Sequence, residues 1–412
     1  NYLDFGYSVF EQTPIKHVKF LRHSARLWRD DDGQLVVEYL EDPVEKWLDF
    51  RLSESDVIDL IRDKVRRWEH SCSGEIIIPT SGGYDTRLLN LLIEDKSRVR
   101  SFTYGISRDQ SKSFEVVYAQ RLSQVLGTKW EQIPLGDFHL YFDEWDRLYG
   151  VSTHAHGMYH IEFYRKIPPK VSGGNPLLSG IIGDVWAGSW TFPDIESASD
   201  LVKLSRSYGM CADSSKSRLV SDHSRREAYF LSQKERMKDP RLRMIEAVRL
   251  KIILLSYLII IPEHFGFKPW SPFLDIEAAM AMLNLPQERR HSRVWQREFF
   301  QRHGLDFENS ELVVDRTNTL DLDALRRRPV RPLSIELLNE VVEPEYVEWI
   351  NRSLLSRLSP WTERALHKLL RVRKVGGALR RMGFAERKSS QLDAYNAYLV
   401  LLPIERLLRR RV

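Results

Sequence analysis

Cysteine is scarce in this sequence, with only Cys72 and Cys211 among 412 residues. Neither belongs to a Cys-x-x-Cys pair, so the sequence predicts no zinc site and no disulfide framework. Scarce, unpaired cysteine is typical of a reducing compartment, and we expect a cytoplasmic protein.

Long apolar runs are missing as well. The most apolar stretch, Ile252 to Pro262, is too short to cross a bilayer, and we expect it to form a core helix. The opening residues do not have the pattern of a signal peptide. With 42% hydrophobic and 29% charged residues, the composition is typical of a soluble globular protein large enough for two or three domains.

Positive charge gathers near the end of the chain, although the net charge is only +5. The basic residues of this segment are Arg371, Arg373, Lys374, Arg380, Arg381, Arg387, Lys388 and Arg409 to Arg411. Such a segment can bind nucleic acid, anionic lipid or an anionic sugar nucleotide. Nearby leucines favour a solvated helical face instead, and aromatic residues that could stack on bases are sparse. We therefore expect no nucleic-acid partner, and contact with a membrane surface stays open.

Strand and helix patterns alternate between residues 75 and 135. We expect strands over 76–78, 99–104 and 129–134, and helices over 87–93 and 114–126. This alternation predicts an α/β fold, with a parallel sheet and helices on both of its faces.

Later segments are mostly helical in pattern. We expect one more strand over 176–182 and helices over 241–257, 275–283 and 294–302. The charged stretch 306–332 is expected to be a loop or a boundary, and the remainder helical. The prediction is thus a parallel-sheet domain followed by a largely helical C-terminal part.

The most informative stretch reads EIIIPTSGGYDT over residues 75–86. A short apolar strand, a glycine turn and an apolar helix form the arrangement that places bare backbone N–H groups against a phosphate. Gly82 and Gly83 let the anion approach the backbone. Ser81 and Thr86 can donate hydroxyl groups, and Asp85 can hold a magnesium ion bound to the same phosphates. The alternative is an ordinary turn; the flanking strand and helix favour the phosphate loop.

The six residues from Ser81 to Thr86 do not form a Walker A loop, because no Gly-Lys-Ser/Thr follows. It resembles the PP-loop, S-G-G-x-D-S/T, of the ATP pyrophosphatases. The resemblance implies ATP and Mg²⁺ as cofactors, with ATP split between its α and β phosphates to give an adenylated substrate and pyrophosphate.

Together with three further blocks, the loop resembles the synthetase domain of glutamine-dependent asparagine synthetase. The other blocks are SFTYG at 101–105, LSGIIGDVWAG at 178–188 and FGFKPWSPFLD at 265–275. The opening residues 2–7 resemble the segment that leaves the glutaminase domain of that family. The resemblance implies a remnant or linker over 1–54, a PP-loop domain over 55–305 and a basic helical extension over 306–412.

The resemblance also implies roles for matching residues. Pyrophosphate would be held by Ser81, Gly82, Gly83, Asp85 and Thr86, adenine by Thr103, Tyr104 and Gly105, and the adenylate by Ser179 and Gly180. Asp85 and Asp184 would share magnesium and serve catalysis. For Asp184, the alternative role is a helix N-cap after Gly183.

Three positions depart from the family pattern. Ile181 and Val185 stand where the family has acidic residues near its amine and acyl-adenylate, which questions aspartate as the substrate. Arg293 stands where the family has a catalytic lysine; an arginine can stabilise oxyanion charge but exchanges protons poorly. The catalytic N-terminal cysteine and the glutaminase domain of that family are absent from this sequence. Either they were cut away, or nitrogen comes from elsewhere, as ammonia, as an amine, or from a separate glutaminase domain or subunit.

A cluster of four residues precedes the third block: His154, His156, Tyr159 and His160. It is expected either to line a pocket for the acceptor substrate or to form a solvent-facing helix start.

The resulting functional hypothesis is an ATP-dependent amide-forming ligase acting on a small-molecule or glycan carboxylate. The pattern resembles the amidotransferases that amidate hexuronic acids in bacterial surface polysaccharides. Alternatives are a macrolactam-forming peptide cyclase similar to lasso peptide cyclases, a degenerate nucleotide-binding subunit without catalysis, and a PP-loop enzyme that modifies RNA. Missing paired cysteines weaken the last of these.

Overall fold

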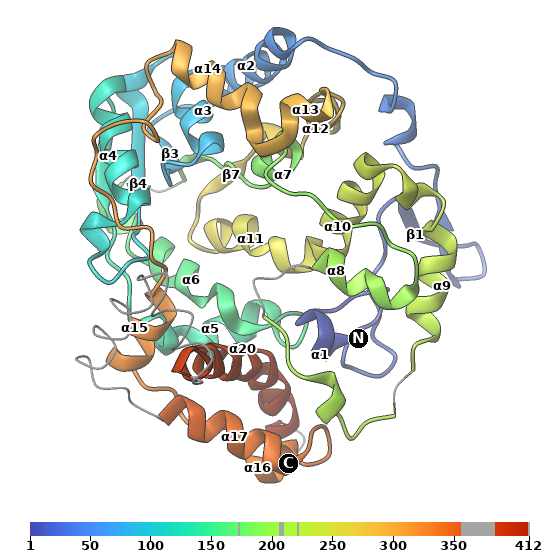
Figure 1. The fold of residues 1–412 in the computed structure, drawn as a ribbon. Helices are drawn as coiled ribbons and strands as arrows, with labels where there is room; N and C mark the ends of the chain where they lie inside the picture. Colours follow the sequence, from blue (N-terminus) through green and yellow to red (C-terminus); the bar gives the residue numbers. More distant parts are fainter. Residues whose placement is uncertain (172–173, 206–209, 221, 356–383, 411–412) are drawn as a thin grey trace.

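The computed structural model describes residues 1–171, 174–205, 210–220, 222–355 and 384–410. A five-stranded parallel sheet is covered by helices on both of its faces. The helices that follow the first strands of the sheet lie at one end of the molecule, and a further group of helices lies at the opposite end (Figure 1). The predicted α/β class with a parallel sheet is confirmed.

The sheet has the strand order β5-β4-β3-β6-β7, and every neighbouring pair is parallel. The strands are β3 (Ile76–Pro79), β4 (Val99–Thr103), β5 (Lys129–Gln132), β6 (Pro176–Leu178) and β7 (Lys268–Trp270). The chain builds outward from β3 to β5 and then returns to place β6 on the other side of β3. This reversal creates a topological switch point between β3 and β6, where ligands of open parallel sheets bind.

The central strand is buried on both faces, as strands of parallel sheets usually are. Ile76 and Ile78 belong to one core cluster and Ile77 to the other, and none of them is exposed to solvent. Burying each such side chain contributes about 1.5–3 kcal/mol. The apolar run predicted as a strand therefore joins the two core clusters that cover the sheet.

Two helices follow the first two strands. Helix α3 (Tyr84–Leu92) begins earlier than predicted, because Gly83 already serves as its N-cap. Helix α4 (Phe114–Leu126) matches the prediction and ends at Gly127, whose φ of 68° is in the left-handed region. At the other end of α3, Lys96 Nζ donates to the carbonyls of Asn90 and Leu91 at 2.7 and 2.8 Å, which satisfies groups left open at a helix C-terminus.

The face of the sheet that carries Ile76 shares a core with several helices. Three of them are α2 (Glu54–Ser71), α12 (Ile276–Leu283) and α14 (Val294–Arg302). Ser53 and Asp56 form a capping box at the start of α2. The helices α12 and α14 confirm two predicted helices, with Asp275 as the N-cap of α12.

The other face of the sheet packs against helices from the middle and the end of the chain. They are α5 (Phe142–Tyr149), α6 (Met158–Arg165), α17 (Pro344–Leu355) and α20 (Phe384–Arg409). Residues Ile77 and Leu177 of the sheet share this core with Leu399 of α20. The predicted extension over 306–412 thus contributes to a core that the sheet also uses, and the three-domain division stays a prediction.

Two sequence predictions are wrong in this part of the chain. The apolar stretch 252–262 is divided between α10 (Pro240–Leu255) and α11 (Tyr257–His264), and Ile252 is 47% exposed, so it is no single core helix. Helix α15 (Leu320–Arg327) lies within the predicted loop because Leu320, Leu322 and Leu325 bury one of its faces.

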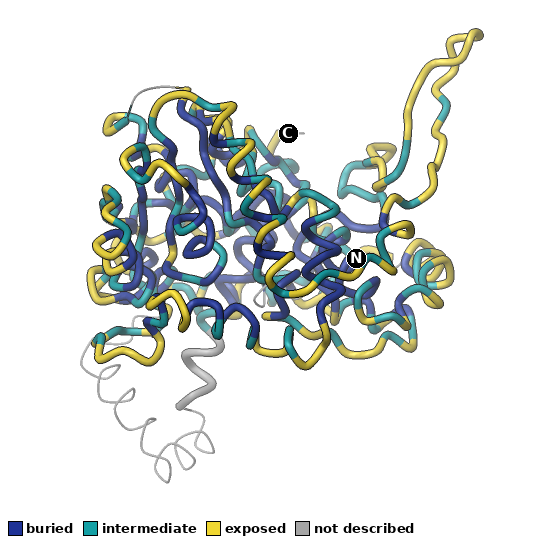
Figure 2. The backbone as a smooth tube through the Cα atoms, turned by 90° about the horizontal axis from the view of Figure 1, so that it is seen from above, coloured by how far each residue is buried: buried dark blue, intermediate teal, exposed yellow. Residues whose placement is uncertain are grey.

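The N-terminal residues form α1 (Tyr2–Phe5) and an antiparallel hairpin of β1 (Ala25–Arg29) and β2 (Leu35–Tyr39). The hairpin is mostly exposed and projects from the body of the molecule (Figure 2). The remaining helices named in Figure 1 are α7 (Gly183–Ala187), α8 (Val202–Ser205), α9 (Ser224–Gln233), α13 (Gln287–Arg290) and α16 (Ile335–Leu338). Within the described ranges, none of the helices combines the length and apolar character that crossing a membrane requires.

Much of the basic segment, including Arg371 to Arg381, lies outside the described residues. Of its last arginines, Arg409 pairs with Glu405 at 2.7 Å and Arg410 with Asp146. These two charges are engaged within the molecule, while the expected membrane contact stays a prediction.

Candidate functional site

The candidate site lies at the carboxyl ends of β3 and β6, the two strands at the switch point. The loop from Ser81 to Thr86 follows β3, and the turn from Ser179 to Gly183 follows β6. Because the two strands are parallel neighbours, the first and third sequence blocks emerge side by side at one edge of the sheet. The fold therefore brings together two segments that are about a hundred residues apart in the sequence.

The loop after β3 requires glycine for two reasons. Gly82 has a φ of 68°, and a Cβ there would clash with the Cβ of Tyr118. Gly83 is the N-cap of α3 and offers no side chain to the N–H groups of the first turn. An uncapped helix N-terminus leaves donors and partial positive charge directed at the loop. The geometry suits an anion, and the phosphate contact stays a prediction.

The two hydroxyl residues of the loop bond weakly to each other. The backbone N–H of Ser81 donates to Thr86 Oγ1 at 3.2 Å, and the two hydroxyl oxygens lie 3.5 Å apart. These distances are at the long end for hydrogen bonds. Both hydroxyl groups can therefore turn toward a stronger acceptor, such as a phosphate oxygen, at small cost.

Asp85 is half-buried at the start of α3, and its buried Oδ1 has no hydrogen-bond partner within the described structure. Burial raises the pKa of Asp85 to about 8, and the nearby carboxylate of Asp184 adds to the rise. Arg293 and Gln296 oppose this shift and favour the charged form. A divalent cation between the two carboxylates would relieve the same repulsion, because it neutralises both charges.

Close packing at two glycines brings the third and fourth blocks against Asp85. A Cβ at Gly180 would lie 3.0 Å from Thr86 Cγ2 and 3.3 Å from Asp85 Cβ. A Cβ at Gly183 would lie 2.9 Å from Asp85 Cγ and 2.8 Å from Phe273 Cδ2. Only glycine fits at Gly183 without displacing these neighbours. Three sequence blocks thus meet around one buried carboxyl group.

Asp184 lies in the first turn of α7 and accepts a hydrogen bond from Trp190 Nε1 at 2.9 Å through Oδ2. The alternative role as an N-cap is wrong, since Ile182 occupies that position with a φ of 53°. A β-branched residue in the left-handed region costs on the order of 1–3 kcal/mol. This strain lies in the turn that places Asp184 beside Asp85.

Arg293 lies close to the loop, at the junction that precedes α14. Its guanidinium carbon lies 4.6 Å from the centre of the Tyr84 ring, and its charge lowers the pKa of Asp85. Ser292 and Arg293 both have positive φ, of 52° and 55°. The predicted basic residue is therefore held beside Asp85 by an unusual turn, and its catalytic role stays a prediction.

Some of the residues predicted to bind adenine and the adenylate already form hydrogen bonds or close contacts within the protein. Thr103 Oγ1 accepts from Trp130 Nε1 at 3.0 Å and donates to the Thr80 carbonyl. A side chain at Gly105 would clash with the backbone of Gln110. Any adenine contact here would therefore come from the backbone after Thr103 rather than from its hydroxyl group.

Ser179 and Gly180 begin the turn after β6. Ser179 Oγ accepts from the N–H of Ile181 at 3.2 Å, and the Ser179 N–H donates to the Trp270 carbonyl at 2.8 Å. Ile181 is buried and packs into the core, as does part of Val185. Where the asparagine synthetases have acidic residues, this chain therefore has side chains that face apolar neighbours.

His154 and His160 of the histidine cluster are buried, and His156 and Tyr159 are half-buried, so the expectation of a solvent-facing helix start is wrong. Burial lowers the pKa of both His154 and His160 to about 3. Tyr104, just past the end of β4, packs against Tyr159 at 5.7 Å and His160 at 6.0 Å between ring centres. The cluster therefore adjoins the edge of the sheet that carries the site, and the acceptor pocket stays a prediction.

Sequence reasoning missed Gln296, which is 1% exposed on α14. Its amide lowers the pKa of Asp85, so it lies beside that carboxyl group. Neither amide atom makes a geometrically acceptable hydrogen bond within the described structure. The available signal was a polar residue among Trp295, Phe299 and Phe300, on the apolar side of a helix.

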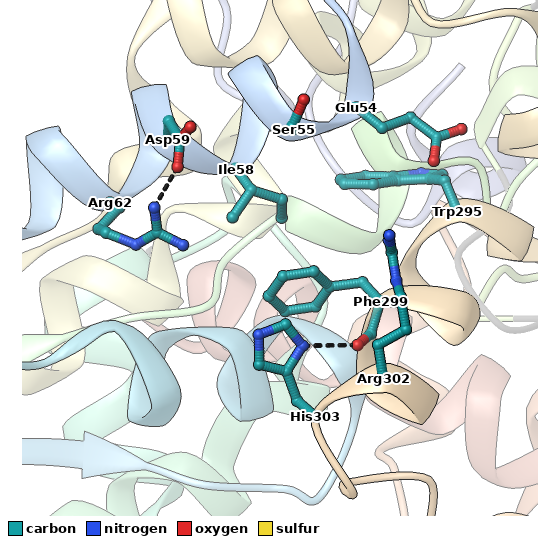
Figure 3. Close-up of a pocket in the computed structure, with 9 residues that line it drawn as sticks. All are labelled: Glu54, Ser55, Ile58, Asp59, Arg62, Trp295, Phe299, Arg302 and His303. Atoms are coloured by element: carbon teal, nitrogen blue, oxygen red, sulfur yellow. Dashed lines mark hydrogen bonds and ion pairs between the residues drawn. The ribbon is translucent and has the colours of Figure 1, made fainter.

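A cavity of about 480 Å³ lies elsewhere, between α2 and α14 (Figure 3). It is lined by Glu54, Ser55, Ile58, Asp59, Arg62, Trp295, Phe299, Arg302 and His303. None of the predicted site residues lines it. Helix α14 thus faces this cavity with Trp295 and Phe299 and approaches the site with Gln296.

A second group of potential metal ligands consists of His23, Asp42 and Glu246, whose ligand atoms lie within 4.8 Å of one another. Arg249 bonds to both carboxylates, at 2.7 and 2.8 Å. Arg236 also pairs with Asp42, at 2.6 Å. The carboxylates are therefore already neutralised by arginine, and the group is an ion-pair network.

Comparison of the sequence with protein-family models finds no match, and comparison with curated proteins finds none either. The functional proposal therefore depends on the residues of this chain and their geometry.

Proposed function

We propose that this chain is an ATP-dependent ligase of the amide-forming kind, which adenylates a substrate carboxylate and transfers the acyl group to ammonia or an amine. One observation carries the proposal. Three segments distant in the sequence meet at the switch point of a parallel sheet, around Asp85, Asp184 and an uncapped helix N-terminus. This combination is suited to a polyphosphate bound with a divalent cation.

The residues present fit ATP and Mg²⁺. The unpaired Oδ1 of Asp85 and the neighbouring carboxylate of Asp184 are oxygen donors of the kind that Mg²⁺ prefers. The N-terminus of α3, with Ser81 and Thr86, would receive the phosphate oxygens. When bound, the magnesium nucleotide supplies an electrophilic α-phosphorus and a pyrophosphate leaving group.

The work of the protein would be positioning and charge neutralisation. A substrate carboxylate oxygen attacks the α-phosphorus while the bond to the β-phosphate oxygen breaks, and pyrophosphate leaves. The loop N–H groups and the two hydroxyl groups would stabilise the charge that gathers on that leaving group. Arg293 would stabilise charge on the acyl-adenylate as the amine nitrogen attacks it, and AMP and a proton are released. No protein nucleophile is required.

The substrate is proposed to be a carboxylate other than aspartate, with a hexuronic acid as the preferred candidate. The apolar surroundings of Ile181 support this choice, because an acidic partner for an amino acid's ammonium group is missing there. The same observation favours one rival, a degenerate subunit that binds nucleotide without catalysis. A carboxyl-bearing peptide, as in macrolactam formation, is a further substrate class to test.

The proposal is tested by phosphorus NMR of ATP incubated with Mg²⁺, ammonium and a panel of carboxylates. The panel includes aspartate, nucleotide-linked hexuronic acids and carboxyl-bearing peptides. AMP and pyrophosphate that appear with one member, and not with Asp85→Ala protein, support the ligase. The matched control is Asp59→Ala, at an exposed position of α2. ADP and phosphate as products would refute the proposal, and nucleotide binding without turnover on any member would favour the degenerate subunit.

A further inference from the structure

Gln296 combines burial with unsatisfied hydrogen-bonding capacity. Its side chain is 1% exposed, and both Oε1 and Nε2 are buried without a partner in the described structure. An unpaired buried amide is destabilising relative to an apolar residue of similar shape. A leucine would pack here at no such cost. The side chain of Asp85 is a polar group within reach of this amide, but an ionised carboxylate leaves the amide oxygen Oε1 without a donor.

The surroundings of Gln296 are rigid and point to the same place. Trp295, its neighbour on α14, donates from Nε1 to the carbonyl of Ala187 at 3.0 Å. Ala187 ends the short helix α7 that carries Asp184. The hydrogen bond therefore fixes α14 directly to the helix of one site carboxylate, while the Gln296 amide lies beside the other, Asp85.

The side chains of Asp85 and Gln296 lie within reach of each other, and each carries a buried oxygen without a hydrogen-bond partner in the described structure: Oδ1 of Asp85 and Oε1 of Gln296. Two neighbouring acceptors cannot satisfy each other, because neither carries a proton to donate when Asp85 is ionised. A hard cation satisfies both, since carboxylate and amide oxygens are both ligands for Mg²⁺ and Mn²⁺. The amide N–H group remains free to donate to Asp85 and hold its orientation.

We propose that Gln296 supplies a third oxygen donor, with Asp85 and Asp184, to the divalent cation of this site. The inference depends on the proposed function, because it names a further ligand for the ion that function requires. It also explains why a polar side chain interrupts the apolar side of α14. The nearby Arg293 would then face the nucleotide rather than the ion, since like charges repel.

The test uses the full chain with Mn²⁺ as the probe and electron paramagnetic resonance to measure free ion. The non-hydrolysable α,β-methylene analogue of ATP is present, so that no turnover occurs. The variants are Gln296→Leu, which removes both polar atoms, and Gln296→Glu, which keeps an oxygen donor. Gln301→Leu is the matched control, because it makes the same change on the exposed side of α14, where Gln301 bonds to Asp306.

Gln296→Leu is expected to weaken Mn²⁺ binding about tenfold or more, and Gln301→Leu to leave it unchanged. Gln296→Glu is expected to bind Mn²⁺ at least as tightly as the wild type, and its melting temperature should rise more on adding Mn²⁺. This second variant also carries the test if Gln296→Leu does not fold. Weaker Mn²⁺ binding by Gln296→Glu, or wild-type binding by Gln296→Leu, would overturn the inference.

An Asp85→Asn variant separates this inference from the proposed function. If Asp85→Asn loses Mn²⁺ binding while Gln296→Leu binds Mn²⁺ fully, only the role of Gln296 as a ligand is refuted. Full binding in Asp85→Asn would instead remove the ion from this site altogether, and with it the basis of the proposed function.

Discussion

Replacing Asp85 by asparagine should stabilise the protein while it inactivates the proposed site. Asp85 is half-buried, with a buried unpaired oxygen beside a second carboxylate, and its pKa is raised from 3.8 to about 8. An asparagine has nearly the same shape and carries no charge. The substitution therefore removes the free-energy cost of ionising an acidic group in this position.

The sign and size of the effect follow from the two pKa values. Because the folded pKa lies above the unfolded one, the folded protein binds an extra proton between pH 4 and pH 8. The stability of the wild type therefore falls as pH rises through this window, and levels off above it. At pH 7 the pKa shift corresponds to a loss of unfolding free energy of roughly 4 kcal/mol as an upper limit. Because the site can relax around the charge, we expect a measured loss of about 2 kcal/mol or more.

The assay is urea denaturation of the wild type and of Asp85→Asn at several pH values from 5 to 8.5, without divalent cations. The stability difference in favour of the variant should widen with pH. Adding Mg²⁺ and ATP analogue should narrow it, because only the wild type retains both carboxylates for the ion. An identical pH dependence in the two proteins, or a less stable variant at pH 8, would refute the reasoning.

Three other changes test the surroundings of the site. Trp270→Ala should lower stability by about 2 kcal/mol in urea denaturation, because Trp270 stacks on Trp68 with 5.2 Å between ring centres; an unchanged midpoint would contradict this contact. Gly183→Ala should abolish pyrophosphate release, since its Cβ would lie 2.9 Å from Asp85 Cγ, and full activity would exclude the proposed packing. Arg293→Ala should lower the rate of product formation about a hundredfold in single turnovers, with Arg293→Lys recovering part of it; equal rates for all three proteins would remove Arg293 from the mechanism.

The sequence was sufficient for those parts of the fold in which local pattern and tertiary packing agree. The isoleucines from Ile76 to Ile78 form the central strand as predicted, because a fully buried parallel strand needs an uninterrupted apolar run. Helices α4 and α14 were also predicted within one residue. Strand β7 was missed because it has only three residues, including Pro269, and is recognisable only from its pairing with β6.

The candidate site was predictable where backbone chemistry determines it. The positions of the loop glycines and of the carboxylates at the strand ends could be predicted from the sequence. A strand followed by two glycines and an aspartate is typical of a turn that binds an anion and a cation. The burial of the histidine cluster and the exposure of Leu274, at 48%, could not be predicted, since both depend on which distant helices cover them. Gln296 was missed for the same reason: its neighbour Asp85 is more than two hundred residues away in the sequence.

The most direct test of the central claim is exchange of labelled pyrophosphate into ATP, measured with Mg²⁺ and the carboxylate that gives AMP in the NMR panel. We expect exchange that depends on that carboxylate, is lost in Asp85→Ala and persists in Asp59→Ala. Exchange that survives in Asp85→Ala would contradict the proposed site. Turnover that releases AMP without any exchange in the wild type would contradict reversible adenylation at this site.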